Sequence, residues 1–588
     1  MESPDKLAVV ARIDALRSGV PVSATVANTE LVVLRVGDEV SVFQGTCPHQ
    51  GTSLVGATVT GTSLECPSHR WCFDTRTGER LDRPGDCLRR FDAVVEQGEV
   101  RVDVCEIGQW TAKSVRKSPH APRGRPGVRS IASLPGPKPL PLVGNVLSLR
   151  ATKFHAAVNA WGAEYGSAFK LSLPGAGVAV ALCNPNTIRG VFRDRPGGFS
   201  RIGSLAPLLQ EIGGHGLFSQ EGDAWRRTRR LTMPAFNMGQ LRSFHGTMNN
   251  ILRRLLGRWE RAAASGRPVH VQDEMTRFTV DITTSLAFGH DLNTIEDKAG
   301  DIRDHLGVLL PRISQRLLAP FPYWRYVRLP GDRAFDRARG AIRALVSELV
   351  AQARASTKGK DPADATTFLE SLVMATDDAG ARLTDTEIYA NVLTMLVAGE
   401  DTTAHTLAWV VHFMTEHPSV QEQMAQEADS VLGGPFAQSL SDYDRLPLIG
   451  AVAAESMRLR PVAPVIFLQA LQDAEVENIA IPKGTTVLLL PRQAGLSDAH
   501  FADAHVFDPQ RWLDGRGGAH HPQALFPFGY GPRHCPGRNL AMTEVASVLA
   551  MLASQFSATK VPGHPEVEER FGFVATATPI HVKLRRRS

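Results

Sequence analysis

Two short segments near the N-terminus each place one cysteine beside one histidine. Cys47-Pro48-His49 is followed, after 16 residues, by Cys66-Pro67-Ser68-His69. Two thiolates can hold one iron and two imidazoles a second iron, with bridging sulfides completing the tetrahedral coordination of both. The same four side chains can also form a structural zinc site. Because Gly45, Gly51 and Trp71 flank them as in β-loops rather than a finger helix, the pattern favours the iron-sulfur alternative over zinc.

A third chemically notable cysteine, Cys535, lies near the C-terminus in the Gly-rich segment 528–541. A helical pattern follows it directly. Backbone N–H groups and the dipole at a helix N-terminus lower the pKa of a thiol, so we expect a stabilised thiolate that can bind a metal. Arg533 adds positive charge beside it.

The segment Ala398-Gly399-Glu400-Asp401-Thr402-Thr403 combines an acid with an alcohol inside an apolar, helical stretch. Gly and β-branched Thr both weaken a helix interior, so another role must offset that cost. Such a run can also mark a capped helix start. The apolar residues 391–397 directly before it argue for a helix interior instead.

These groups require two kinds of scaffold. Residues 1–108 contain short β-rich runs separated by turn signals, which predicts a small all-β domain. Helical apolar spacing follows at 240–264, 335–357, 385–417 and 538–555, which predicts a large, mainly α domain over 131–588. The fold class expected is therefore multidomain, with a small β domain before a large helical one.

The two predicted domains are joined by a basic, proline-rich segment. Residues 109–150 carry eight Lys or Arg and no Asp or Glu, with seven prolines from Pro119 onward. We expect a semi-extended linker over 109–130. Residues 1–108 hold 16 acidic and 11 basic side chains. The basic linker is either a solvated tether or a means of docking the acidic domain on a basic surface.

With these features assembled, the N-terminal 108 residues resemble the Rieske [2Fe-2S] family. The paired Cys-x-His and Cys-x-x-His loops carry the resemblance. It implies a [2Fe-2S] cluster ligated by Cys47, His49, Cys66 and His69.

The large domain resembles the cytochrome P-450 family. The Phe, Gly, Arg, Cys and Gly at 528, 531, 533, 535 and 537 match the haem loop of that family at each fixed position. The resemblance implies haem b held by the thiolate of Cys535, with Phe528 in the same loop. Arg533 is expected to pair with a haem propionate.

Two further matches support the same family. Trp225 and Arg229, four residues apart, match the family helix that hydrogen-bonds a haem propionate. Glu455 and Arg458 match a buried pair that, in the family, is completed by a basic residue from a segment like 507–512. That group of charges braces the haem core in the family.

The resemblance also assigns roles within residues 398–403. Asp401 and Thr402 would guide protons to bound O₂, and the small residue before them would leave a groove for O₂ over the haem. Thiolate donation from Cys535 would promote O–O cleavage.

Composition excludes several other classes. The chain has 588 residues, 43% hydrophobic and 21% charged, with a formal net charge of +5. This is the balance of a globular protein and gives no argument for nucleic-acid binding. No window of 18 apolar residues occurs, and the seven cysteines are too few and odd in number for a disulfide framework. We therefore expect a cytoplasmic protein without a transmembrane segment.

The sequence thus predicts an oxidoreductase, a monooxygenase that inserts one atom of O₂ into a lipophilic organic substrate by hydroxylation or epoxidation. Electrons are expected from NAD(P)H through a separate flavin-containing ferredoxin reductase and the fused cluster. One alternative is a non-catalytic redox or gas-sensing protein, which the acid-alcohol pair disfavours. The other is a peroxide-driven enzyme, which the donor domain disfavours.

Overall fold

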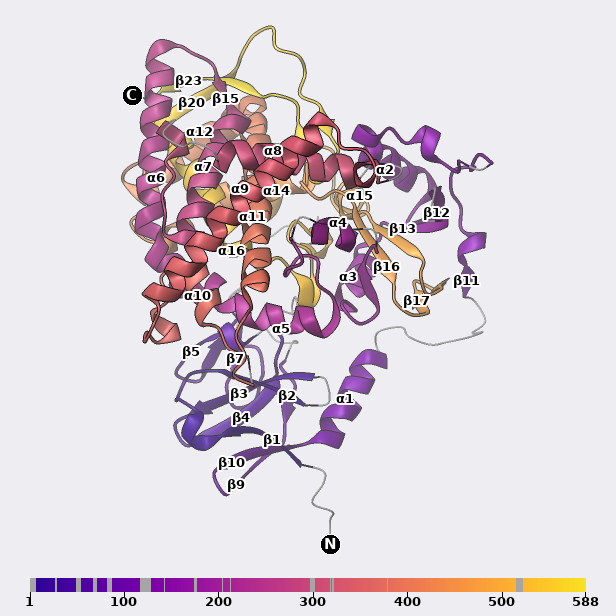
Figure 1. Ribbon diagram of the computed structural model, residues 1–588, viewed down its shortest axis with the longest axis vertical. Helices are drawn as coiled ribbons and strands as arrows, with labels where there is room; N and C mark the ends of the chain where they lie inside the picture. The colour runs from indigo at the N-terminus through magenta and orange to yellow at the C-terminus, as the bar shows by residue number, and fades with distance from the viewer. Residues whose placement is uncertain are drawn as a thin grey trace.

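The computed structural model describes the chain from residue 7 to residue 587. Outside the description are residues 1–6, 27–28, 49–53, 67–70, 82–86, 117–127, 142, 174–176, 204, 212, 297–301, 318, 320–321, 378, 514–521 and 588. The described residues form a small β domain and, above it in Figure 1, a larger helical domain.

Three antiparallel sheets build the small domain, as alternating hydrophobic residues predict. Their strand orders are β1-β10-β9, β2-β3-β4-β8 and β5-β6-β7. The strands are β1 (Leu7–Arg12), β2 (Val22–Val26), β3 (Thr29–Val36), β4 (Glu39–Gln44), β5 (Thr58–Thr60), β6 (Ser63–Glu65), β7 (Cys72–Asp74), β8 (Arg90–Phe91), β9 (Ala93–Glu96) and β10 (Glu99–Asp103).

A helix, α1 (Val104–Arg116), crosses the boundary predicted at residue 109. The Trp110 ring packs edge-on against Phe91 with ring centroids 5.4 Å apart, and Ile107 is fully buried in the same core. The extended conformation expected from residue 109 is therefore wrong for 109–116. The prolines that prevent helix formation begin only at Pro119. We accordingly propose that the small domain ends after residue 116.

The large domain is built around long helices. They are α2 (Phe154–Tyr165), α3 (Pro185–Arg193), α4 (Leu205–Glu211), α5 (Gly222–Thr232), α6 (Met238–Ser265), α7 (Val271–Phe288), α8 (Ile302–Leu317), α9 (Pro330–Ser356), α10 (Phe368–Met374), α11 (Asp385–Glu416), α12 (Pro418–Leu432), α13 (Leu440–Tyr443), α14 (Pro447–Leu459), α15 (Pro491–Gly495) and α16 (Arg538–Gln555). The four helical segments expected from apolar spacing are present as α6, α9, α11 and α16. The predicted fold class is confirmed.

Short sheets flank this helical core. The largest has the strand order β12-β13-β19-β16-β14, and smaller ones are β11-β18-β17, β15-β23-β20 and β21-β22. The strands are β11 (Arg129–Ser130), β12 (Ala168–Leu173), β13 (Gly177–Leu182), β14 (Phe199–Arg201), β15 (Val269–His270), β16 (Ile466–Ala470), β17 (Ala474–Val476), β18 (Ile479–Ile481), β19 (Thr486–Leu489), β20 (Phe556–Lys560), β21 (Glu569–Arg570), β22 (Thr576–Ala577) and β23 (His581–Arg586). Among the helices of the described residues, none is long and apolar enough to span a membrane.

A buried charge network ties α14 to the 507–512 segment. Arg458 donates to both carboxylate oxygens of Glu455 at 2.7 and 2.8 Å. Arg511 and Trp512 donate to the same carboxylate, each at 3.0 Å. Glu455 and Arg458 are fully buried, so each charge depends on its partners. The buried pair and the added basic residue expected from the sequence are confirmed.

The glycine of the acid-alcohol segment has a packing role. A Cβ built on Gly399 would lie 2.7 Å from Cγ2 of Thr283 on α7. The missing side chain therefore allows α11 to approach α7. The expectation that the small residue also leaves a groove for O₂ stays a prediction.

Gly399→Ala is expected to lower the free energy of unfolding by about 1–3 kcal/mol, because the added methyl overpacks the α7–α11 contact. The measurement is urea unfolding followed by the helical signal. Adding Thr283→Ser removes Cγ2 but keeps the hydroxyl that donates to the Thr279 carbonyl, so the double variant should recover most of the loss. Gly246→Ala, with open space at its Cβ, is the control and should not destabilise. Equal loss in the single and double variants would contradict the packing role.

Candidate functional site

Cys47 and Cys66 of the small domain lie in one apolar core. The Leu54 N–H donates to the Gly45 carbonyl at 2.8 Å, which closes the loop containing Cys47. The Cys66 N–H donates to the Trp71 carbonyl at 2.9 Å and closes the second loop. Both thiols are buried in the same cluster. Two buried thiols in one cluster fit one half of the expected ligand set.

The predicted ligands His49 and His69 lie outside the described residues. Among the residues that are described, no group of three potential metal ligands occurs. Cys47 and Cys66 are both buried.

In the large domain, Cys535 lies in a tight loop directly before α16. Its N–H donates to the Phe528 carbonyl at 2.9 Å. Gly531 has a φ of +69°, and a Cβ there would lie 2.7 Å from the Phe192 carbonyl oxygen at the end of α3. A side chain at Gly531 is excluded on both counts. The loop is thus fixed between α3 and α16.

The thiol pKa differs from the sequence expectation. Burial raises the pKa of Cys535 above its ordinary value, although the Gly537 N–H, Arg229 and Arg538 act in the opposite direction. In the protein without a bound metal, the loss of hydration raises the thiol pKa more than the helix N-terminus lowers it. An iron cation bound to the sulfur would favour the thiolate.

A cluster of arginines lies beside this loop. Arg533 donates to Glu221 at 2.6 Å and to the Gln220 carbonyl, and Arg195 lies 3.5 Å from the same carboxylate. Burial lowers the pKa of Arg201 well below its ordinary value, and Arg195 and Arg533 lower it further. Among the described residues, Glu221 is the one carboxylate that acts on all three guanidinium groups.

This charge imbalance fits haem. Three arginines and one carboxylate leave two positive charges without a partner, and haem carries two propionates. Nε of the buried Arg195 has no hydrogen-bond partner, so this arginine has a donor to offer besides the Nη2 that faces Glu221. A buried donor without an acceptor is costly, which supports a ligand at this position. The thiol of Cys535 and these arginines together supply the donor set that haem requires.

The other predicted haem-binding residues converge on the same place. The Arg533 guanidinium lies 4.7 Å from the centroid of the Trp225 ring. Nη2 of Arg229 lies 3.3 Å from Nε2 of His534, directly before Cys535. Burial lowers the pKa of Arg229 to about 10, against the opposing effects of Cys535 and Glu30. Trp225, Arg229 and Arg533 therefore surround the Cys535 loop, and their roles toward haem remain predictions.

Sequence reasoning missed Arg195, Arg201 and Glu221. Arg201 ends β14 in an apolar neighbourhood, and Glu221 is the N-cap of α5. The available signal for this cluster was the position of the charged Arg201 between the buried Phe199 and the apolar residues that follow. It is weak, because isolated arginines are common at strand ends.

The acid-alcohol pair lies in the middle of α11, not at a helix start. The Thr402 hydroxyl donates to the Ala398 carbonyl at 2.7 Å, so its oxygen keeps lone pairs that can accept a proton. Burial raises the pKa of Asp401 to about 6. One turn later, burial lowers the pKa of His405 to about 4. An acid with a pKa near 6 can give and regain a proton at neutral pH.

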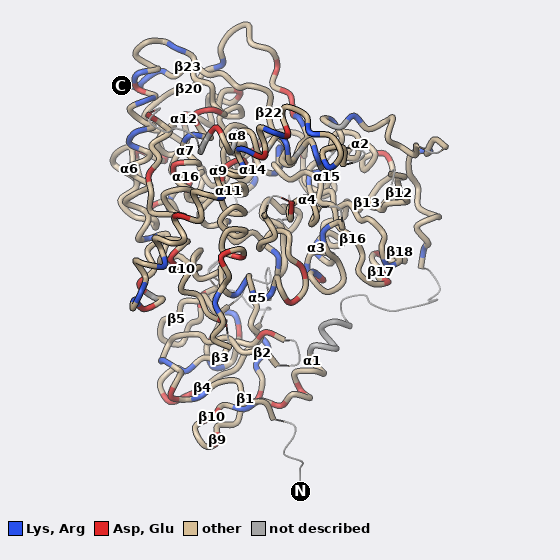
Figure 2. The backbone as a smooth tube through the Cα atoms, viewed as in Figure 1, with Lys and Arg blue, Asp and Glu red and all other residues tan. Residues whose placement is uncertain are grey.

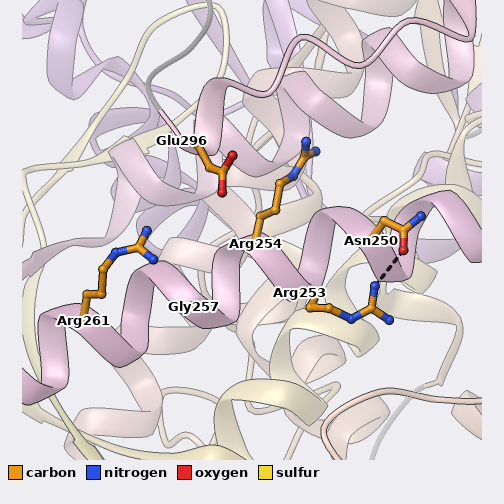
Figure 3. A pocket seen from close by; sticks show the side chains of 6 residues that line it. All are labelled: Asn250, Arg253, Arg254, Gly257, Arg261 and Glu296. Carbon is orange, nitrogen blue, oxygen red and sulfur yellow. Dashed lines mark hydrogen bonds between the residues drawn. The ribbon is translucent and has the colours of Figure 1, made fainter.

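A groove of about 370 Å³ on α6 contains none of the predicted site residues (Figure 3). Its lining is charged, and Arg254 within it is bound by Asp291 at 2.6 Å. The lining residues are Asn250, Arg253, Arg254, Gly257, Arg261 and Glu296.

Comparisons with known proteins agree with this site. A family model described as Cytochrome P-450 matches residues 134–584, and one described as Rieske [2Fe-2S] domain matches residues 6–92. Cyclooctat-9-en-7-ol 5-monooxygenase of Streptomyces melanosporofaciens is 30% identical over 448 residues, 75% of this chain and 92% of that protein. Pentalenene oxygenase of Streptomyces avermitilis is 27% identical over 453 residues, 76% of this chain and 95% of that protein.

A solved structure is also similar. The crystal structure of the cytochrome P-450DA haem domain has a TM-score of 0.70 and 25% identity, over 78% of this chain and 98% of that one. The chain belongs to the cytochrome P-450 family and carries an N-terminal Rieske [2Fe-2S] domain. It is an oxidoreductase, a monooxygenase that uses haem and O₂ to oxygenate organic substrates.

Cys535→His is expected to abolish the thiolate-haem Soret band of the reduced protein with carbon monoxide, because no other thiol lies in this loop. The iron-sulfur signal should remain. Cys183→Ala is the matched control, since Cys183 is also a buried thiol of the large domain and its pKa is raised to about 12 by burial. Persistence of the band in the Cys535 variant would exclude this residue as the ligand.

Proposed function

We propose that this chain is a monooxygenase whose own N-terminal domain is its immediate electron donor. That domain takes single electrons from a separate flavin-containing, NAD(P)H-dependent reductase. Hydroxylation then balances as R–H + O₂ + NAD(P)H + H⁺ → R–OH + H₂O + NAD(P)⁺. We also place the reaction in the cytoplasm, because seven cysteines are too few and odd in number for the disulfide framework of a secreted protein.

One observation carries this proposal. The Rieske [2Fe-2S] domain and the haem domain belong to one chain, and the small domain lies below α5 and α10 in Figure 1. The tether keeps this donor at a high effective concentration beside the large domain.

The large domain supplies the side chains that would hold haem and move protons. Bound haem would provide O₂ activation and C–H oxidation. Cys535 would hold the iron, and Arg195, Arg201 and Arg533 would hold the propionates. Asp401 would supply a proton to Oγ1 of Thr402, and the Thr402 hydroxyl would pass its own proton on toward the oxygen being reduced.

The substrate proposed is lipophilic and mostly hydrocarbon. Leu205, Leu208 and Leu209 of α4 are buried in the same apolar core as Met395 and Leu396 of α11, just before the acid-alcohol segment. The names of the two Streptomyces relatives denote an alkenol and an alkene, which is the same chemical character. The substrate can be identified by incubating the enzyme, its reductase and NAD(P)H with a metabolite extract and detecting the oxygenated products by mass spectrometry.

Deleting residues 1–116 is expected to stop NAD(P)H-driven turnover with the cognate reductase, because the electron-accepting domain is gone. The deletion ends after α1 because that helix packs on the small domain. Carbon monoxide binding by the chemically reduced truncated protein should be normal, and an added ferredoxin should restore part of the turnover. Full turnover of the truncated protein with reductase alone would overturn the proposal.

Asp401→Asn is expected to lower the rate of substrate oxidation by about 100-fold or more, the usual contribution of a proton donor. The wild-type rate should fall as pH rises through about 6, because the raised pKa leaves Asp401 ionised above that value. Ionising this carboxyl also destabilises the fold as pH rises from its unfolded pKa toward 6, so the variant should be the more stable protein at pH 7. A pH-rate profile with the same limb in the variant would exclude Asp401 as the donor.

Thr402→Ala is expected to keep NAD(P)H consumption but to divert much of it to hydrogen peroxide, because the variant lacks the Oγ1 hydroxyl that guides protons to bound O₂. The measurement is the ratio of product to NAD(P)H consumed. Thr406→Ala, which removes a hydroxyl bonded to the Thr402 carbonyl one turn later, is the control. Unchanged coupling in Thr402→Ala would contradict the assigned role.

A further inference from the structure

Exposed apolar side chains gather on the chain between β11 and α2, which runs beside β12 at the outer edge of the large domain (Figure 1). Leu147 is 73% exposed and Leu140 is 51% exposed. Single exposed apolar residues are common, but several in one place mark a surface that contacts something apolar. Here Leu140, Val143, Val146 and Leu147 together form an apolar edge.

Backbone hydrogen bonds anchor the apolar edge to the five-stranded sheet. The Leu140 N–H donates to the Gly144 carbonyl at 2.8 Å, and the Gly144 N–H donates back to the Leu140 carbonyl at 2.9 Å. The Ser172 N–H on β12 donates to Oδ1 of Asn145 at 2.7 Å, and the Asn145 N–H donates to the Ser172 carbonyl at 2.9 Å. Ser172 also pairs with Val178 on β13, so another exposed valine lies one strand away.

The backbone of this segment is restrained. A Cβ on Gly144 would lie 2.6 Å from the Ser172 carbonyl oxygen, and the φ of Gly144 is +58°. Only glycine permits this approach in this conformation. Four prolines between residues 135 and 141 fix φ along the chain before it. The apolar side chains are therefore held on the surface by a restrained backbone.

Basic side chains flank the apolar edge. Residues 107–163 contain no Asp or Glu, and Figure 2 accordingly shows blue but no red along the chain from β11 to the start of α2. Lys138 and Arg150 lie on either side of the apolar edge and make no ion pair among the described residues. Glu568 reaches the next cation, Lys153, at 2.6 Å. Two cations beside the apolar edge thus lack a carboxylate.

This combination of features selects the occupant. Leucine and valine side chains can enter the headgroup region of a bilayer, and cations beside them attract anionic lipids. A second copy of this chain fits less well. A symmetric contact between two apolar edges would bring the cations of both copies near one another, and like charges repel.

We propose that the apolar edge, with Lys138 and Arg150, is a contact surface for an anionic lipid bilayer. The apolar side chains enter the headgroup region, and the two cations face lipid phosphates. The contact is peripheral, because it uses side chains on the surface of one segment. It goes beyond the proposed function and does not depend on it, since binding to a vesicle requires neither electrons nor substrate.

The test is co-sedimentation of the full-length holoprotein with lipid vesicles at low and high salt. One vesicle is phosphatidylcholine alone, and the other also contains anionic phosphatidylglycerol. The variants are Leu147→Gln and the double variant Lys138→Gln/Arg150→Gln. Leu471→Gln is the matched control, because Leu471 is also an exposed leucine of the large domain but is followed by the acidic Asp473. The carbon monoxide spectrum checks that each variant keeps its fold.

We expect the wild type to bind the anionic vesicles more tightly than the neutral ones, and this difference to shrink as salt rises. Leu147→Gln should weaken binding to anionic vesicles about tenfold, because glutamine does not gain from leaving water as leucine does. The double charge variant should lose about fivefold for each cation. Leu471→Gln should bind as the wild type does.

Failure of the wild type to bind either vesicle at low salt would overturn the proposal, as would equal losses in Leu147→Gln and Leu471→Gln. Equal binding to neutral and anionic vesicles, or wild-type binding by the double charge variant, would overturn the role of the cations. Sedimentation equilibrium without lipid tests the other occupant. A dimer that Leu147→Gln dissociates would assign the apolar edge to a second copy and overturn the lipid contact.

Discussion

The structure depends most on the fixed position of the Cys535 thiol. Gly531 lets the loop pass within van der Waals distance of the end of α3, and the Phe528 carbonyl binds the Cys535 N–H. The start of α16 is thereby set, and with it the place of Arg538. The buried network around Glu455 holds a neighbouring part of the same core. A shift of this loop would misplace both the thiol and the start of α16.

Positive charge is concentrated around that thiol from two directions. Arg195, Arg201 and Arg533 share Glu221 and leave charge for an anionic cofactor. Arg229 lies 3.3 Å from His534, and the Arg538 guanidinium lies 6.0 Å from the centroid of the Phe528 ring. Burying so many guanidinium groups is costly unless anions meet them, and a bound anionic cofactor would offset that cost.

Much of this arrangement follows from the sequence because it rests on local patterns. The Cys535 loop, the Glu455 pair and the long helices are coded by short motifs and by apolar periodicity. The helical conformation of 109–116 was missed because this stretch is basic like the segment after it, and the contact of Trp110 with Phe91 depends on the tertiary structure. The role of Gly399 and the shared carboxylate of Glu221 required knowing which distant segments meet. Local spacing holds no such information, and the net effect of burial on the Cys535 pKa also depends on the tertiary structure.

The account holds that the small domain meets the large one at the thiol side of its core. Low-temperature electron paramagnetic resonance of the full-length protein with a reduced cluster tests this directly. The spin relaxation of the cluster should be faster when the haem iron is ferric than when it is ferrous and bound by carbon monoxide, which is diamagnetic. Identical relaxation in the two states would show that the centres are too far apart to interact, and would contradict the docked arrangement.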